Sequence, residues 1–411
     1  KYEKLKTKII TIQLIKNILS LDSKHKVLEY LDYFSKTKLP MYGKMRNFDL
    51  EDKSKNNVSY LSPLIVRRII TEQEIIKYVL ERHKFKEIEK FIHEVYWRSY
   101  WRGFLESRPK IYSDYKIELD NLVESNALEH YSNAVNGNTG IECFDFWVQE
   151  LTSSGYLHNH VRMWFASIWI FTLKIPWQLG ADFFIRNLLD GDFASNTLSW
   201  RWVAGLHTKG KHYIAFPENI KKYTQNKFYP VENLNINPSP IVEESHYDIE
   251  PFSFTKLKTE EQLSCLLIHE NDLSFDIQSN FDFIIIQGSI HPKNQRSLVV
   301  NNYISSCLDN TFANAQKKYS GKIFSFDWND SNRLNQFLDN NNIKKIFSAY
   351  PLISDLKSQI DTFFKTIDIK LVYYNNSWDI NVWPHCSKGF FKLKKEIPNL
   401  IMNYSNPTKE L

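Results

Sequence analysis

The spacing of apolar residues changes character once along this chain of 411 residues, near residue 233. Before that point, in Glu72–Phe104 and again in Gly155–Leu189, apolar residues recur every three or four positions, which predicts amphipathic helices. After residue 254 short apolar runs alternate with helix-like segments, as in a parallel sheet. The predicted strands are Cys265–Ile268, Phe281–Gln287, Lys322–Phe326, Lys345–Ser348 and Lys370–Tyr374. The chain is therefore predicted to be an α + α/β protein, all-helical first and Rossmann-like second.

The change of pattern also predicts the domain boundary. Residues 233–254 contain three prolines and no sustained period, so we expect an interdomain linker there. We predict a helical domain over residues 1–232 and a parallel α/β domain over residues 255–411. The second domain has neither a GxGxxG nor a GxxxxGK[ST] motif, which disfavours a standard dinucleotide or P-loop site.

The composition excludes several protein classes. The 28 Phe, 22 Tyr and 11 Trp give too much apolar surface for a disordered chain. The 4 Cys are far apart with no CxxC, which indicates buried thiols in a reducing compartment and no zinc or iron–sulfur site. The apolar run Met163–Leu173 is too short to span a bilayer, and Lys1–Leu21 shows no signal peptide. We therefore expect an intracellular, cytoplasmic protein without membrane contact.

Two motifs early in the helical half suit a nucleotide-like ligand, and each has a plainer structural alternative. Ser59 and Ser62 precede Pro63, so a helix starting there either binds a phosphate or only carries a serine cap. Glu94 and Trp97 share a helical face with Arg98. That face either binds a flat heterocycle or holds a structural ion pair beside a core tryptophan.

A third motif follows the most apolar helix. Asp190 and Asp192 flank a glycine, and an amide and two tryptophans come after them at helical spacing: Asn196, Trp200 and Trp202. Two carboxylates suit Mg²⁺ or glycoside hydrolysis, but nothing nearby completes either site. His158 and His160 lack a third ligand, so we expect no metal. The set fits redox or light chemistry on a flavin better.

Taken in order, these motifs resemble the flavin-binding domain of the DNA photolyase and cryptochrome family. The resemblance covers roughly residues 40–213. It rests on the Tyr42…Arg46 patch, Ser59-Tyr-Leu-Ser-Pro63, Glu94-Val-Tyr-Trp97-Arg98, Gly155-Tyr-Leu-His-Asn159-His-Val-Arg162-Met163, Trp177 and Asp190-Gly-Asp192…Asn196…Trp200-Arg-Trp202. It implies that the helical domain binds FAD.

The resemblance also implies a role for each matched residue. The residues that would hold FAD are Tyr42, Ser59, Leu61, Ser62, Arg98, Asn159, Arg162, Asp190, Asp192 and Asn196. Asn196 would face flavin N5, and Arg162 would pair with Asp190. The lesion pocket would be lined by Glu94, Trp97, Met163 and Trp202, and electrons would pass through Trp200 and Trp177. Asn159 and Met163 favour the branch that repairs cyclobutane dimers over the (6-4) branch.

The implied function is light-dependent DNA repair. FAD-mediated electron transfer would split a cyclobutane pyrimidine dimer flipped out of DNA, the carbon–carbon lyase reaction of a deoxyribodipyrimidine photolyase. The expected partner is damaged DNA, bound by a monomer that is associated with the nucleoid if the protein is bacterial. Two alternatives stay open: a cryptochrome-like blue-light photoreceptor without repair activity, and a flavin-free helical scaffold that binds nucleic acid.

Three features depart from the family pattern. The α/β domain, which resembles the antenna domain at Leu371–Glu396, follows the flavin domain instead of preceding it, so we expect a permuted domain order. Val58 and Phe91 stand where the family usually has Thr and Trp. The third electron-relay residue has no match, which leaves Trp147, Trp164, Trp169 or a tyrosine as outer donor. No set of residues selects a second, antenna chromophore.

Overall fold

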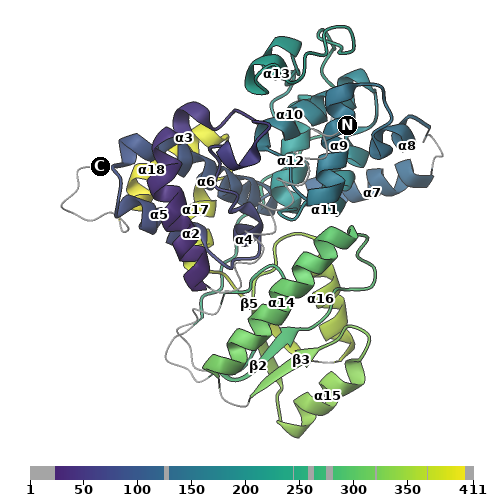
Figure 1. The fold of residues 1–411 in the computed structure, drawn as a ribbon. Coiled ribbons are helices and arrows are strands. Elements are labelled where there is room, and N and C mark those ends of the chain that lie inside the picture. Colours follow the sequence, from purple (N-terminus) through teal and green to yellow (C-terminus); the bar gives the residue numbers. More distant parts are fainter. Residues whose placement is uncertain are drawn as a thin grey trace.

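The first part of the chain is helical (Figure 1). The computed structural model describes residues 24–124, 129–243, 245–257, 263–274, 281–319, 322–367 and 369–402. The helices of the first part are α2 (Lys24–Thr37), α3 (Leu39–Met45), η1 (Lys53–Lys55), α4 (Ser62–Val66), α5 (Glu72–Leu80), α6 (Phe85–Glu106), α7 (Lys110–Glu124), α8 (Glu129–Asn136), α9 (Glu142–Ser154), α10 (Asn159–Ser167), η2 (Ile168–Thr172), α11 (Trp177–Asn187), α12 (Phe193–Ala204) and α13 (Pro217–Tyr223).

The helix ends follow local capping. The predicted helical region over Glu72–Phe104 contains two helices, α5 and α6, because the polar residues 81–84 interrupt the apolar period. The Thr71 hydroxyl accepts a hydrogen bond from the N–H of Glu74, and the Glu74 carboxylate accepts one from the N–H of Thr71, which starts α5. In the second helical region α10 continues directly into η2, a turn of π-helix.

The second part contains one parallel sheet. Its strands are β1 (Leu263–Ile268), β2 (Phe281–Gln287), β3 (Ile323–Phe326), β4 (Lys345–Ala349) and β5 (Lys370–Tyr374), in the order β3-β2-β1-β4-β5. All five predicted strands are present, so the predicted fold class is confirmed. The helices α14 (Leu298–Lys318), α15 (Ser331–Asn340) and α16 (Asp355–Thr366) alternate with them. Ile284 and Ile286 pack with Ile304 on one face of the sheet, and Ile285 packs with Ile360 on the other.

The segment after β5 returns to the helical part. It forms α17 (Ser377–Val382), η3 (Trp383–His385) and α18 (Phe390–Ile401), which pack on α6. In Figure 1 the yellow α17 and α18 lie among the purple N-terminal helices. Trp378 Nε1 donates a hydrogen bond to Ser99 Oγ at 2.8 Å, and Gly103 leaves room for Cys386, since a Cβ there would lie 2.7 Å from the Cys386 side chain. The division at residues 233–254 stays a prediction, but the last helices complete the core around α6.

Two sequence expectations about the whole chain can be compared with the structure. The four cysteines, Cys143, Cys265, Cys307 and Cys386, are buried free thiols, as predicted. Across the residues that the structure describes, no helix is both long enough and apolar enough to cross a membrane. The apolar run Met163–Leu173 is divided between α10 and η2, with Leu173 just after the end of η2.

Buried ion pairs join the two parts. Arg68, just after α4, donates hydrogen bonds to Asp379 Oδ2 at 2.6 Å and to Asp272 Oδ2 at 3.2 Å. Arg67 Nη1 donates to the backbone oxygen of Glu270 at 3.3 Å. Because a buried charge without its partner is costly, these contacts fix how the sheet sits on the end of α4.

Glu106 makes a further contact between the two parts, at the end of α6. Its carboxyl group accepts hydrogen bonds from the N–H of Ile353 at 2.7 Å and from the hydroxyl of Tyr350 at 3.0 Å. Burial raises the pKa of Glu106 to about 7, although both hydrogen bonds lower it. The folded chain therefore holds a proton there that the unfolded chain has already released.

We predict that Glu106 makes the protein less stable as the pH rises. The folded state binds more protons than the unfolded state between the ordinary glutamate pKa and about 7, so the free energy of unfolding falls through that range and levels off above it. In Glu106→Gln this fall should disappear. Urea unfolding at several pH values, taken as the difference between wild type and variant, measures it. An identical pH profile in both proteins would contradict the prediction.

Candidate functional site

The predicted polar residues of α6, α10 and α12 meet in one buried network. Asp192 caps α12 by accepting the N–H of Ser195 at 2.9 Å. Arg102 Nε donates to Asp192 Oδ2 at 2.7 Å, and Arg98 Nη1 lies 3.5 Å from the same oxygen. From α10, Arg162 Nη2 donates to Asp190 Oδ2 at 3.0 Å. The two aspartates thus hold arginines from two different helices.

The electrostatics of this network keep both carboxylates ionised. Burial alone raises the pKa of Asp192, but the charges of Arg102 and Arg98 outweigh it and hold the pKa below its ordinary value. Burial likewise raises the pKa of Asp190, and Arg162 and Arg98 lower it by more. For Arg98 burial dominates and lowers the pKa of the guanidinium despite Asp192. Arg98 is therefore the least compensated cation of the group.

Three polar atoms of this network are buried without a hydrogen-bond partner among the described residues: Arg98 Nη1, Asp190 Oδ1 and Ser195 Oγ. Such atoms are uncommon in native proteins and indicate a ligand or a water. A guanidinium donor, a carboxylate acceptor and a hydroxyl match the N–H and C=O edges of a flat heterocycle. The residues present therefore fit a flavin.

The segment Ser59–Ser62 lies beside the same network. The hydroxyl of Ser62 contributes to lowering the pKa of Asp190, after burial and the arginines. Tyr60 adopts a left-handed backbone conformation with φ of 54°, and its hydroxyl donates to the backbone oxygen of Lys53 at 3.0 Å. Leu61 is fully buried and precedes α4. The chain thus turns sharply just before the predicted phosphate position.

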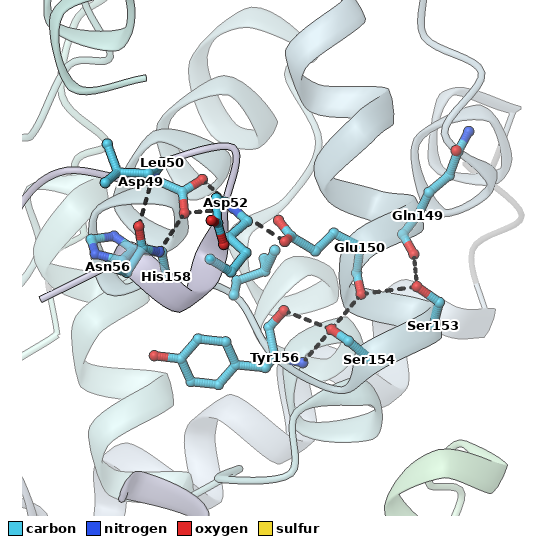
Figure 2. A network of polar contacts seen from close by, with 12 residues as sticks. Asp49, Leu50, Asp52, Asn56, Gln149, Glu150, Ser153, Ser154, Tyr156 and His158 are labelled. Carbon is cyan, nitrogen blue, oxygen red and sulfur yellow. Dashed lines mark hydrogen bonds and ion pairs between the residues drawn. The ribbon is translucent and has the colours of Figure 1, made fainter. Parts of the chain in front are cut away.

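A second buried polar network involves Asp49 and, on α9, Glu150 (Figure 2). Lys53 Nζ lies 2.6 Å from Asp49 and 3.2 Å from Glu150, and all three side chains are buried. Burial lowers the pKa of Lys53, but the two carboxylates outweigh it and raise the pKa. Ser154 Oγ donates to the backbone oxygen of Glu150 at 2.7 Å. The network therefore ties the segment before Tyr60 to the end of α9.

The redox-related residues lie along α11, α12 and η2. Asn196 donates its side-chain amide N–H to the backbone oxygen of Ala181 at 2.8 Å, which leaves its oxygen as the remaining acceptor. Trp200, one turn further on, contacts the ring of Trp169 with centroids 6.1 Å apart. Trp177 stacks on Tyr115 at 5.6 Å, and the Arg201 guanidinium lies over its ring.

The residues predicted for the lesion pocket lie on three helices, with Glu94 and Trp97 on α6, Met163 on α10 and Trp202 on α12. Glu94 accepts a hydrogen bond from Arg46 Nη1 at 2.6 Å. The ring of Trp97 is stacked on Phe390 of α18, with centroids 3.7 Å apart and planes 11° apart. Trp202 stacks on Tyr213 at 5.6 Å. Glu94, Trp97, Trp202 and also Met163 are only partly buried.

Two predicted cofactor residues stand apart from the arginine network. Tyr42 packs its ring edge-on against Phe91 at 5.2 Å, and burial raises its pKa. Asn159 is the first residue of α10, and its side chain is exposed. Their predicted roles therefore stay predictions. In the described part of the chain, no group of three or more His, Cys, Asp or Glu side chains could hold a metal ion.

Sequence reasoning missed several residues of the site. Arg102 binds both Asp192 and Glu72 Oε1, the latter at 3.0 Å; its position four residues after Arg98 was the available signal. Lys53 also has a signal, because Asp49 precedes it by four residues. Phe390 had none, since nothing local indicates that a helix almost 300 residues away in the chain covers Trp97.

Comparison with known proteins supports the resemblance. Residues 91–230 match the model of the FAD binding domain of DNA photolyase. The resemblance inferred from the motifs, and FAD as the cofactor of this domain type, are confirmed for that region. Tyr42, Ser59, Leu61 and Ser62 precede the matched region.

Several curated relatives are named deoxyribodipyrimidine photo-lyase. The protein of Buchnera aphidicola subsp. Baizongia pistaciae is 30% identical over 195 residues, which are 46% of this chain and 40% of the relative. The protein of Streptomyces griseus is 33% identical over 159 residues, 38% of this chain and 34% of the relative. The chain thus spans well under half the length of these two relatives.

Two solved structures are similar to about half of this chain. A bacterial class III photolyase from Agrobacterium tumefaciens is 27% identical, with a TM-score of 0.42, over 49% of this chain and 42% of that one. A cryptochrome from Synechocystis is 23% identical, with a TM-score of 0.42, over 49% and 43%.

Proposed function

We propose that this chain binds FAD in its helical part and uses blue light to split cyclobutane pyrimidine dimers in DNA, the reaction of a deoxyribodipyrimidine photolyase. The observation that carries the proposal is the network of Arg98, Asp190 and Ser195, which has buried polar atoms without a hydrogen-bond partner that suit a flavin, inside a region that matches a photolyase FAD binding domain. Damaged DNA would be the partner.

The protein's own residues would bind and orient the cofactor. Arg98 and Asp190 offer a donor and an acceptor to the heterocycle, while Arg102 and Arg162 hold the aspartates in place. Ser59 and Ser62 would face the diphosphate, supported by the buried Lys53 network. When bound in reduced form, FAD supplies under blue light the electron that opens the cyclobutane ring and accepts it back.

Asn196 would set the redox preference of the site. Its amide nitrogen is engaged with Ala181, so an oxygen acceptor is left for a flavin N–H. An acceptor beside N5 would favour a flavin that carries a proton there. The amide is uncharged, so it neither repels an electron-rich flavin nor donates a proton of its own.

We expect Asn196→Asp to change which reduced form of the flavin accumulates in light. A carboxylate there repels negative charge when ionised and donates a proton when protonated, whereas the amide does neither. Anaerobic illumination followed by absorption spectroscopy measures the difference. Asn187→Asp, an amide change near the end of α11 outside the network, is the control. Identical spectra for wild type and Asn196→Asp would remove Asn196 from the N5 position.

Glu94, Trp97, Met163 and Trp202 would form the dimer pocket. A flipped pyrimidine pair would stack on the tryptophans, since base–aromatic stacking contributes about 1–3 kcal/mol per base. Burial raises the pKa of Glu94, although Arg46 lowers it, so Glu94 takes up a proton more readily than an ordinary glutamate. It would then donate a hydrogen bond to a dimer carbonyl where negative charge develops.

One observation favours the photoreceptor alternative. Phe390 covers a face of Trp97 at 3.7 Å, so that face is not free to stack on a base. A blue-light receptor without repair activity has no need of that face. The two functions therefore make opposite predictions about whether dimers in DNA are repaired in light.

The test uses the purified full chain. Its visible spectrum and flavin-to-protein ratio establish the cofactor. The flavin is then reduced chemically, and the protein is mixed with ultraviolet-irradiated oligothymidylate, with one sample in blue light and one in the dark. Both samples are analysed by chromatography, and restored thymine that is found only in the illuminated sample supports repair. A flavin-loaded protein that leaves all dimers intact in light would favour the photoreceptor.

A further inference from the structure

The sequence does not determine the route by which electrons reach the flavin in the proposed chemistry. Trp147, Trp164, Trp169 and the tyrosines were all possible outer donors. In the structure Trp147 and Trp164 stack on each other at 5.6 Å, and Trp164 stacks on His160 at 4.4 Å. Trp169 instead contacts the ring of Trp200. The geometry therefore separates these tryptophans into two groups.

Three aromatic rings in contact, Trp200, Trp169 and Tyr131, form a row that leads outward from Trp200. Trp200 and Trp169 contact each other at 6.1 Å with planes 82° apart, and Trp169 contacts Tyr131 of α8 at 5.9 Å with planes 85° apart. Trp200 is 2% exposed and Trp169 is fully buried, whereas Tyr131 is only partly buried. The row of rings thus begins one helical turn from Asn196 and ends at the phenol of Tyr131, which solvent can reach.

Two features of the backbone hold this row of rings in place. Trp169 lies in η2, the turn of π-helix, a rare element that is frequent at functional sites because it rotates side chains off the regular helical register. Its Nε1 donates to the backbone oxygen of Pro176 at 3.0 Å, which fixes the ring. Gly180 admits both indoles, since a Cβ there would lie 2.3 Å from Trp200 and 3.0 Å from Trp169.

The other aromatic branch ends inside the protein. Trp177, the second relay residue expected from the family resemblance, stacks on Tyr115 at 5.6 Å. Tyr115 is 2% exposed. A tyrosine that loses an electron must also lose its phenolic proton, and a phenol buried to this extent has little access to water. Tyr131 has that access.

We propose that Tyr131, Trp169 and Trp200 form, in that order, the electron route from the surface to the flavin. This inference rests on the proposed use of FAD in light. One electron leaves the Tyr131 phenol and passes through the two indoles to the light-excited oxidised flavin, which is reduced by one electron. The phenolic proton passes to water, so Tyr131 becomes a neutral radical. An external thiol gives it a hydrogen atom and restores the phenol.

The experiment compares Tyr131→Phe and Trp169→Phe with Trp164→Phe, a change of equal chemistry in the other tryptophan group, and with Tyr115→Phe in the other branch. Melting temperature and flavin content are measured first. Transient absorption after a blue flash then follows the radicals, with dithiothreitol as reductant. We expect a tyrosyl signature in wild type and both controls, and in Tyr131→Phe a tryptophanyl radical that takes its electron back from the flavin about tenfold faster or more.

A second readout detects the protein radical itself and not the flavin. Illumination with a nitroso spin trap, followed by mass spectrometry, should place the adduct on Tyr131 in wild type. An adduct on another residue, or unchanged radical signals in Tyr131→Phe, would overturn the route. If Trp169→Phe does not fold, the partly exposed Tyr131→Phe decides. Dimer repair with chemically reduced flavin needs no relay, so all variants should repair as wild type does. If the wild-type protein with chemically reduced flavin repairs no dimers, the proposed repair function is refuted, but the proposed electron route is not.

Discussion

Replacing Asp192 with alanine should lower the free energy of unfolding by about 3–5 kcal/mol, the usual cost of removing one partner from a buried ion pair. Asp192 Oδ2 accepts a hydrogen bond from Arg102 and also lies next to Arg98; Asp192 and Arg102 are buried, and the Arg98 side chain is 16% exposed. Without it the two guanidinium groups face each other, and Glu72 and Asp190 are left as the nearby carboxylates that offset their charge. Guanidinium chloride unfolding measures the loss.

The matched control is Asp114→Ala. Asp114 pairs with Lys110 one turn away, but that lysine is exposed, and such surface pairs contribute at most about 1 kcal/mol. The pH dependence adds a second check. The pKa of Asp192 is held low in the folded state, so its contribution is full above the ordinary aspartate pKa and is lost as the pH falls. Equal losses in Asp192→Ala and Asp114→Ala would contradict this account of the network.

The second large effect concerns Phe390. In Phe390→Ala the covered face of Trp97 becomes free, so the proposed repair function predicts about tenfold tighter binding of dimer-containing DNA. The variant should also lose about 3–5 kcal/mol of stability, because Phe390 is 5% exposed. Phe391→Ala is the control, since its neighbouring ring is 75% exposed. Fluorescence anisotropy with labelled oligonucleotides measures the affinities at a temperature where all variants are folded.

The role of Trp97 is isolated by a double-mutant cycle. Trp97→Ala alone should weaken dimer binding, and it should also abolish the gain from Phe390→Ala, because that gain needs the indole. Binding to undamaged DNA, which depends on phosphate contacts, should hardly change. If Phe390→Ala stays folded and binds dimers no better than wild type, Trp97 does not stack on the lesion through that face, and the photoreceptor alternative gains weight.

Local patterns predicted the secondary structure well. The five strands follow from apolar runs such as Phe281–Gln287, because a strand buried on both faces needs a continuous apolar sequence. The helical spacing over Glu72–Phe104 predicted helices there but not the boundary between α5 and α6, which lies in the polar residues 81–84. The expected flavin-domain type is confirmed for residues 91–230, which carry four of the six motifs.

What sequence reasoning could not reach are the contacts between distant segments. Glu106 with Ile353, and Arg68 with Asp379, join residues more than 240 positions apart. Nothing in the local sequence indicates these contacts, since a glutamate at a helix end and an arginine after a short helix are ordinary surface residues in most chains. Only the return of the chain onto α6 buries them and makes them ion pairs or shifted titrating groups.

The return of α17 and α18 to α6 has a consequence for synthesis. Ser99 and its partner Trp378 are 279 residues apart. At typical elongation rates of about 5–20 residues per second, α6 waits roughly 14–56 s on the ribosome before that partner is made. During this interval the apolar side of α6 that faces Trp378, Val382 and Phe390 is exposed to water and to chaperones. The helical part can finish folding only after the sheet has been translated, so the flavin-binding half of the chain matures last although most of it is made first.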